Sequence, residues 1–283
     1  MQVIETVDGI RKALAAERAA GRTVGLVPTM GFLHAGHSSL MRRASAECDV
    51  AAATIFVNPL QFAAGEDLTS YPRDIDHDRA VAEECDVAYL FTPTVEEMYG
   101  TAPVRTSVTV AEVGDGLEGA ARPTHFAGVA TVVAKLLNIA GPCRAYFGEK
   151  DWQQLQVVRR LVTDLSFPVE VVGCPTVREP DGVAMSSRNN YLAPDERRAA
   201  TVLHRALLTG RAAAAAGDDP VGAMTEVVAA EPLAHLDYAA ERDGRLLVAV
   251  RIGTTRLIDN MAVAAVTCGG SARPLDPTDP YEE

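Results

Sequence analysis

Short apolar runs alternate with amphipathic helical segments through the first 175 residues, and this alternation limits the possible folds more than any other feature. The expected strands cover residues 24–27, 50–57, 87–91, 145–147 and 169–172. The expected helices cover residues 7–20, after Thr6 as N-cap, then 38–48, 75–85, 129–140 and 152–165. Strands joined by helices pair in parallel through right-handed crossovers. The pattern therefore predicts an α/β fold with a Rossmann-like parallel sheet.

The character of the chain changes after about Pro175. A polar loop over 178–190 precedes an alanine-rich helix expected at 194–216 and a shorter helix at 221–230. Three antiparallel strands are expected at 237–240, 246–250 and 255–258, with a tight turn at Asp243-Gly244. We expect a Rossmann-like domain over 1–175, a smaller α+β lid domain over 176–268, and a disordered tail over 269–283, which holds three prolines.

Charge and composition exclude several classes of partner. The chain has 38 acidic and 26 basic residues, a formal net charge of −12. Nucleic acid and anionic membranes both require a basic surface, so neither is expected as a partner. No apolar run approaches the ~20 residues of a membrane-spanning helix. Residues 1–12 contain two acids and lack the apolar stretch of a secretory signal, which favours a cytoplasmic protein.

The strongest chemical signal is the string Pro-Thr-Met-Gly-Phe-Leu-His-Ala-Gly-His over residues 28–37, between an expected strand and a helix. Ligands of open α/β sheets bind at the carboxyl ends of strands, where a helix N-terminus favours phosphate. His34 and His37 are three residues apart, which places both imidazoles on one face of the first helical turn as hydrogen-bond donors. Gly31 and Gly36 allow close approach of the backbone. We predict a phosphate-binding site here.

Two further segments follow expected strands in the same way. Gly-Glu-Lys-Asp over 148–151 opens a helix, with Lys150 as a cation for phosphate and Gln154 one turn further on the same side. A solvated capping cluster is the alternative for this segment. Asn58 and Gln61 follow the second strand, and amides both donate to and accept from a hydroxylated carboxylate substrate. Asn58 could equally form a local turn with Pro59.

The polar loop contains Met185-Ser186-Ser187-Arg188, whose hydroxyls and guanidinium suit a phosphate clamp, although such loops are often only linkers. His125 begins a helix and is expected mainly as a cap-region histidine. Residues 114–119 match G-x-G-x-x-G, but two acids within the match would repel pyrophosphate, so we reject it as a dinucleotide site.

The whole set of motifs resembles the pantoate–β-alanine ligase (pantothenate synthetase) family of the nucleotidyltransferase superfamily, over about residues 20–261. His-x-Gly-His within the 28–37 string carries the superfamily signature. The other matching segments are 56–62, 71–73, 122–129, 147–151, 185–189 and 255–260. The resemblance implies an ATP-dependent ligase that joins pantoate and β-alanine through a pantoyl adenylate, with Mg²⁺ on the phosphates and a homodimeric assembly.

The resemblance also implies residue roles. The catalytic residues it indicates are His37, His34, Lys150 and Arg188. Its ATP contacts are Met30, Gly31, Phe32, Leu33, His34, Ala35, Gly36, His37, Gly148, Glu149, Lys150, Asp151, Val177, Met185, Ser186, Ser187 and Arg188. Gln61 and Gln154 would bind pantoate, with Gln61 also next to β-alanine, and Asn58 would assist.

Two other classes stay open at this stage. One is an adenylyltransferase of the same superfamily that transfers AMP without ligation, and the other is a nonenzymatic nucleotide-binding relative. The Gln61 and Gln154 pair argues against the first, and the intact phosphate-facing residues argue against the second.

Overall fold

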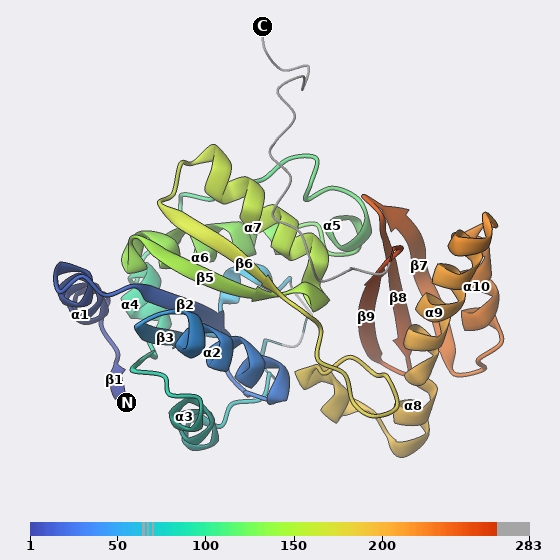
Figure 1. Cartoon of the computed structure of the whole chain (residues 1–283), viewed down its shortest axis with the longest axis horizontal. Helices are drawn as coiled ribbons and strands as arrows, with labels where there is room; N and C mark the ends of the chain where they lie inside the picture. The colour runs from blue at the N-terminus through green and yellow to red at the C-terminus, as the bar shows by residue number, and fades with distance from the viewer. Residues whose placement is uncertain (64–65, 67, 70, 265–283) are drawn as a thin grey trace, which may run out of the picture.

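A six-stranded parallel sheet forms the larger part of the structure, a computed structural model that describes residues 1–63, 66, 68–69 and 71–264 (Figure 1). In spatial order its strands are β1 (Gln2–Ile4), β4 (Tyr89–Phe91), β3 (Val50–Ile55), β2 (Val24–Thr29), β5 (Cys143–Gly148) and β6 (Val169–Cys174). The central strands are buried on both faces, which explains their continuous apolar sequence. The predicted parallel α/β sheet is confirmed.

Helices cover both faces of this sheet (Figure 1). The helices on one face are α1 (Val7–Ala19), α6 (His125–Ala140) and α7 (Trp152–Asp164), and those on the other are α2 (Ala35–Glu47) and α3 (Ile75–Glu84). Shorter elements are α4 (Val95–Tyr99), α5 (Leu117–Ala121) and the 3₁₀ turns η1 (Pro59–Gln61), η2 (Glu149–Asp151) and η3 (Ser187–Tyr191). Thr6 caps α1 as predicted, by accepting a hydrogen bond from the Gly9 N–H.

The strand order reverses between β2 and β5. After β2 the chain leads through α2 to β3 on one side, and β5 later adds on the opposite side of β2. The two connections leave their strands in opposite directions, so a crevice opens at the carboxyl ends of β2 and β5. The segments that begin at His34 and at Gly148 both start at this crevice.

A second, antiparallel sheet lies beside the first (Figure 1). It consists of β7 (Ala234–Arg242), β8 (Arg245–Ile252) and β9 (Thr255–Ala262), and α9 (Thr201–Ala216) and α10 (Pro220–Ala229) share its hydrophobic core. At the β7–β8 turn Asp243 and Gly244 have φ of 50° and 68°, the left-handed pair that a two-residue hairpin turn requires. The predicted hairpin is confirmed, whereas the division into two domains at 175 stays a prediction.

Three local predictions need correction. The helix expected at 194–216 is two helices, α8 (Pro194–Ala199) and α9, which are separated at the buried Ala200, where ψ is −20°. The helix expected from 38 begins at Ala35, which makes His34 its N-cap. Strand β1 was not expected, since three residues are too few to show a period. The tail expected at 269–283 lies outside the described residues.

No helix within the described part of the chain has both the length and the apolar character to cross a membrane.

Candidate active site

His34 and His37 use one ring nitrogen each to cap α2. The Gly36 N–H donates to His34 Nδ1 at 3.1 Å, and the His34 N–H donates to His37 Nδ1 at 3.3 Å. A nitrogen that accepts cannot carry a proton, so in both rings the hydrogen resides on Nε2. The two rings lie 4.1 Å apart, and both line the cleft at the switch point. The helix N-terminus is therefore extended into the cleft by two imidazole N–H donors.

Both imidazoles are neutral at physiological pH. Burial lowers the pKa of His34 to about 4, with a further contribution from the Lys150 ammonium. Burial, together with the adjacent His34, lowers the pKa of His37 to about 3. Protonation would also break the two capping bonds, since both Nδ1 atoms accept them. These side chains can donate hydrogen bonds to an anion but bring no positive charge of their own.

The loop between β2 and α2 is held from behind by Asp78, a residue that the sequence did not single out. Its carboxylate accepts hydrogen bonds from the Phe32 N–H at 2.9 Å and the Leu33 N–H at 2.6 Å, and it is almost fully buried. Gly31 has φ of +86°, and a Cβ there would lie 2.8 Å from the Asp78 carboxylate and 2.9 Å from Ile55. Gly31 is thus required by backbone conformation and by lack of space.

Lys150 faces the histidines from the other side of the crevice. It lies on turn η2 directly after β5, and its ammonium is 3.3 Å from the Asp151 carboxylate. Burial opposes ionisation of Asp151, but Lys150 and Arg188 together hold its pKa below the ordinary value. Gln154, on the first turn of α7, lines the same cleft, as the spacing predicts.

Gln61 is fixed by two neighbours. Its Oε1 accepts from Asn58 Nδ2 at 3.1 Å, and its Nε2 lies 3.0 Å from Met30 Sδ. Asn58 is 1% exposed, and its side-chain Oδ1 accepts from the Leu60 N–H and from the Tyr99 hydroxyl. Asn58 thus forms the local turn that was one of its two alternatives, and it orients Gln61 from inside the protein. Contact between Asn58 and substrate stays a prediction.

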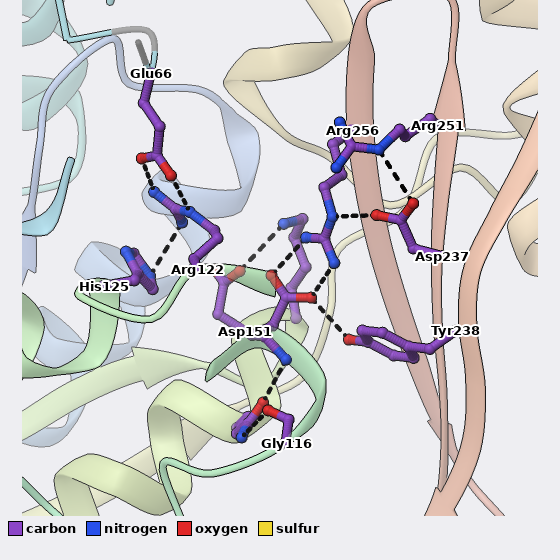
Figure 2. Close-up of polar contacts among 12 residues, drawn as sticks. Glu66, Gly116, Arg122, His125, Asp151, Asp237, Tyr238, Arg251 and Arg256 are labelled. Atoms are coloured by element: carbon purple, nitrogen blue, oxygen red, sulfur yellow. Dashed lines mark hydrogen bonds and ion pairs between the residues drawn. The ribbon is translucent and has the colours of Figure 1, made fainter. Parts of the chain in front are cut away.

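Arg122 and Glu66 form an ion pair, with His125 beside it, that was not predicted (Figure 2). Both Arg122 and His125 contact Gln61. The Arg122 guanidinium binds the Glu66 carboxylate through two bonds of 2.9 and 2.5 Å, and it donates to the main-chain carbonyl of Gln61 at 3.2 Å. His125 Nδ1 donates to that same carbonyl at 3.0 Å, so its Nε2 accepts from Arg122 at 3.2 Å. Arg122 and His125 line the cleft. Arg122 and His125 belong to the 122–129 segment that matches the family, but sequence spacing alone did not relate these residues to Gln61.

Residues 177–185 form a hairpin at the mouth of the cleft. The Met185 N–H donates to the Val177 carbonyl at 3.0 Å, and Arg178 pairs with Ala184 in an antiparallel bridge. Ser186 caps η3 by accepting from the Arg188 N–H at 3.3 Å. Val177 and the Met185–Arg188 segment consequently border the same space as Lys150.

The cleft gathers most of the predicted site residues. Those that line it are Met30, His34, Gly36, His37, Asn58, Gln61, Gly148, Lys150, Asp151, Gln154, Val177, Met185, Ser186, Ser187 and Arg188. Five predicted nucleotide contacts lie outside the lining: Gly31, Phe32, Leu33, Ala35 and Glu149. Leu33 belongs to the core beneath α2, and Glu149 pairs with Arg245 at 2.7 Å. Leu33 and Glu149 therefore support the residues around the cleft and do not line it.

Fold and cleft together define an α/β protein with a ligand cleft at the switch point of its parallel sheet, lined by two neutral imidazoles and by amide side chains. The pantoate–β-alanine ligase family profile matches residues 2–262. The chain is 51% identical over 282 residues to the pantothenate synthetase of Rhizobium meliloti (strain 1021), covering 93% of this chain and 97% of that protein. It is also 51% identical to the pantothenate synthetase of Brucella anthropi, covering 94% of this chain and 98% of that protein. The chain belongs to the pantoate–β-alanine ligase family.

Solved structures agree with this assignment. The pantothenate synthetase of Thermus thermophilus superposes with a TM-score of 0.88 at 49% identity and covers 94% of this chain and 100% of its own. The pantoate–β-alanine ligase of Francisella tularensis, solved in complex with β,γ-ATP and β-alanine, has a TM-score of 0.81 at 32% identity and covers 93% of this chain and 98% of its own.

Proposed function

We propose that this chain condenses pantoate with β-alanine, using ATP and releasing AMP and pyrophosphate. The observation that carries the proposal is the arrangement of the His34 and His37 Nε2–H donors opposite Lys150, with Gln61 and Gln154 in the same cleft. The first group suits a polyphosphate and the second a hydroxylated carboxylate. Binding of ATP and β-alanine by the Francisella relative supports the same substrates here.

In the first step a pantoate carboxylate oxygen attacks the α-phosphorus of ATP, and the bond to the bridging oxygen of pyrophosphate breaks. A carboxylate of pKa ~4 is already ionised at neutral pH, so the step needs no general base. His34, His37, Lys150 and Arg188 would stabilise the negative charge that develops on pyrophosphate. Donors that are already fixed by capping bonds need no reorganisation when that charge appears.

In the second step the β-alanine amine attacks the acyl carbon of pantoyl adenylate, the amide bond forms, and AMP leaves with the acyl oxygen. The amine must first lose the proton of its ammonium form, of pKa ~10. We place the acceptor substrate beside Gln61, because the resemblance puts this residue between the pantoate and β-alanine positions and its side chain lines the cleft. Arg122 is paired with Glu66 and holds the Gln61 main chain in place.

Mg²⁺ fits this cleft as an ion held chiefly by the nucleotide. Among the described residues no group of three or more His, Cys, Asp or Glu side chains could hold a metal. Asp151 is a carboxylate in the lining, and Mg²⁺ at nucleotide sites commonly takes one or two carboxylates with phosphate oxygens. When bound, Mg²⁺ would neutralise phosphate charge. We also propose a cytoplasmic homodimer, as the resemblance implies; sedimentation of the purified protein would test its dimeric state.

An omission experiment tests the proposed function. The protein is incubated with ATP, Mg²⁺, pantoate and β-alanine, and each component is left out in turn while AMP is measured. The ligase releases AMP continuously only with both acids present. Release of pyrophosphate without free AMP would favour transfer without ligation, because AMP then stays on the acceptor. Absence of both products under all conditions would favour a nonenzymatic relative.

A further inference from the structure

Strand β9 belongs to the smaller sheet, yet two of its side chains hold segments of the nucleotide site. The 255–260 motif that coincides with this strand has no role in the mechanism above. Asp259 and Asn260 are 3% and 4% exposed and line the cleft. Their partners lie on two separate walls of that cleft.

Asn260 binds the backbone of the turn that carries Lys150. Its Nδ2 donates to the Glu149 carbonyl at 2.9 Å and to the Lys150 carbonyl at 2.8 Å, while its Oδ1 accepts from Arg245 Nη1 at 3.0 Å. A guanidinium can only donate, so Arg245 fixes which end of the amide faces the turn. Both amide hydrogens are used within the protein. Asn260 therefore acts through the turn and not by contact with substrate.

Asp259 binds the base of the hairpin that leads to Ser186 and Arg188. Its carboxylate forms a two-bond ion pair with the Arg178 guanidinium, at 2.6 and 3.0 Å. Arg178 also donates to the Gly182 carbonyl at 2.9 Å, across the same hairpin. Asp259 Oδ1 further accepts from the Asn260 N–H at 2.8 Å, so the two β9 residues are fixed to each other.

We propose that Asp259 and Asn260 are positioning residues that set the distance between the Lys150 turn and the Ser186–Arg188 segment for ATP. One strand holds both segments, so the two cationic side chains meet the triphosphate in a fixed relation. Misplacement of reacting groups by about 1 Å can cost 10²-fold in rate. This inference rests on the proposed function only because its rate assay uses the ligase reaction; the binding of an ATP analogue tests it independently of that reaction.

Asn260→Asp is the test, because it keeps the shape of the side chain and puts an oxygen opposite two carbonyl oxygens. We expect pantoate-dependent ATP–pyrophosphate exchange to fall about 10²-fold. Reaction of supplied pantoyl adenylate with β-alanine should stay within about threefold of wild type, because pyrophosphate has already left before this step. This second step also requires a folded protein, so it serves as a control for folding. Binding of a nonhydrolysable ATP analogue should weaken, and the melting temperature should show that the fold is kept.

Arg242→Ala is the matched control. Arg242 also joins the smaller sheet to main-chain carbonyls of the larger part, at Glu112 and Asp115 (3.2 Å each), but it lies outside the cleft lining. Its exchange rate should equal that of wild type. Equal loss in both half-reactions of Asn260→Asp, wild-type exchange by that variant, or the same loss in Arg242→Ala would overturn the inference. If wild type fails to ligate but Asn260→Asp still weakens analogue binding, the proposed function falls and the inference stands.

Discussion

At the scale of single residues, the two ring nitrogens of His37 have separate tasks. Nδ1 accepts the His34 N–H and belongs to the helix cap, whereas Nε2 carries the proton on a ring that lines the cleft. His34 divides its nitrogens in the same way. A substitution can therefore keep an acceptor at the Nδ1 position, which preserves the helix cap, and remove the donor at the Nε2 position. Such a variant separates the effect on stability from the effect on catalysis.

His37→Asn places an amide oxygen near the Nδ1 position and lacks a donor at the Nε2 position. We expect the variant to fold with nearly unchanged stability and to lose about 10²-fold in ATP–pyrophosphate exchange, as loss of a preorganised donor does. His37→Gln, which can return a donor near the Nε2 position, should recover part of the rate. Exchange at the wild-type rate in His37→Asn would contradict the role of Nε2.

Gln61→Ala removes an amide that lies beside Met30 and Asn58. We expect the KM for pantoate to rise by about tenfold or more, which corresponds to loss of roughly 1.4 kcal/mol, while calorimetry finds the same affinity for an ATP analogue. The neighbouring Asn58 should be more sensitive in stability, since its polar atoms are satisfied inside the protein. A selective loss of ATP affinity in Gln61→Ala would show that Gln61 is misplaced.

At the scale of elements, helix α5 is attached to the smaller sheet through Glu118. The Arg256 guanidinium donates to both Glu118 carboxylate oxygens, at 2.6 and 2.7 Å, and the Tyr238 hydroxyl donates at 2.9 Å. The side chains of Glu118 and Arg256 are only 10% and 15% exposed. The rejected G-x-G-x-x-G match thus contains a structural contact between the sheets.

Glu118→Ala removes one of the two carboxylate partners of the largely buried Arg256 guanidinium. Asp237 remains and accepts from Arg256 Nε at 2.6 Å. Removal of one partner of a buried ion pair costs on the order of 3 kcal/mol. Urea unfolding should show this loss. Arg198→Ala is the control, since its pair with Asp195 is about three-quarters exposed at both ends and should change stability by less than about 1 kcal/mol. Equal effects in the two variants would refute the argument from burial.

At the scale of the whole molecule, the formal charge of −12 does not leave the cleft acidic, because each acid in its lining is paired with a cation. Two of the acids in the lining, Glu118 and Asp259, are paired with Arg256 and Arg178. Asp151 is paired with Lys150, which stays at the wall of the cleft. An acidic protein can therefore accept anionic substrates, because its pocket acids are neutralised by local pairs.

Three histidines that the fold keeps neutral make stability depend on pH. Burial lowers the pKa of His34 and His125 to about 4 and that of His37 to about 3, whereas an unfolded histidine has a pKa near 6.5. Between about pH 6.5 and 4 the unfolded chain therefore binds more protons than the folded chain, and the free energy of unfolding must fall as the pH falls.

Urea unfolding across this range measures the effect. Each such histidine contributes a slope of up to about 1.4 kcal/mol per pH unit. His37→Asn should reduce this slope by up to the contribution of one bound proton. His235 is exposed, so His235→Asn serves as the control and should leave the slope unchanged. An unchanged slope in His37→Asn would mean that His37 is charged in the folded protein.

The sequence by itself determined the elements and the local chemistry. Periodicity predicts strands, helices and the hairpin at Asp243-Gly244, because each depends on neighbours along the chain. It also indicates His34, His37, Lys150 and Gln61, because strand-to-helix junctions mark the ligand edge of a parallel sheet.

Only the tertiary structure decided which of these residues meet and what holds them. Asp78 behind the 31–33 loop, Arg122 beside Gln61, and the β9 residues at the Lys150 turn are each tens of residues away from their partners. No local pattern encodes such contacts, since they depend on strand order and on how the two sheets pack. The proton positions on His34 and His37 were settled the same way, by where helix α2 begins.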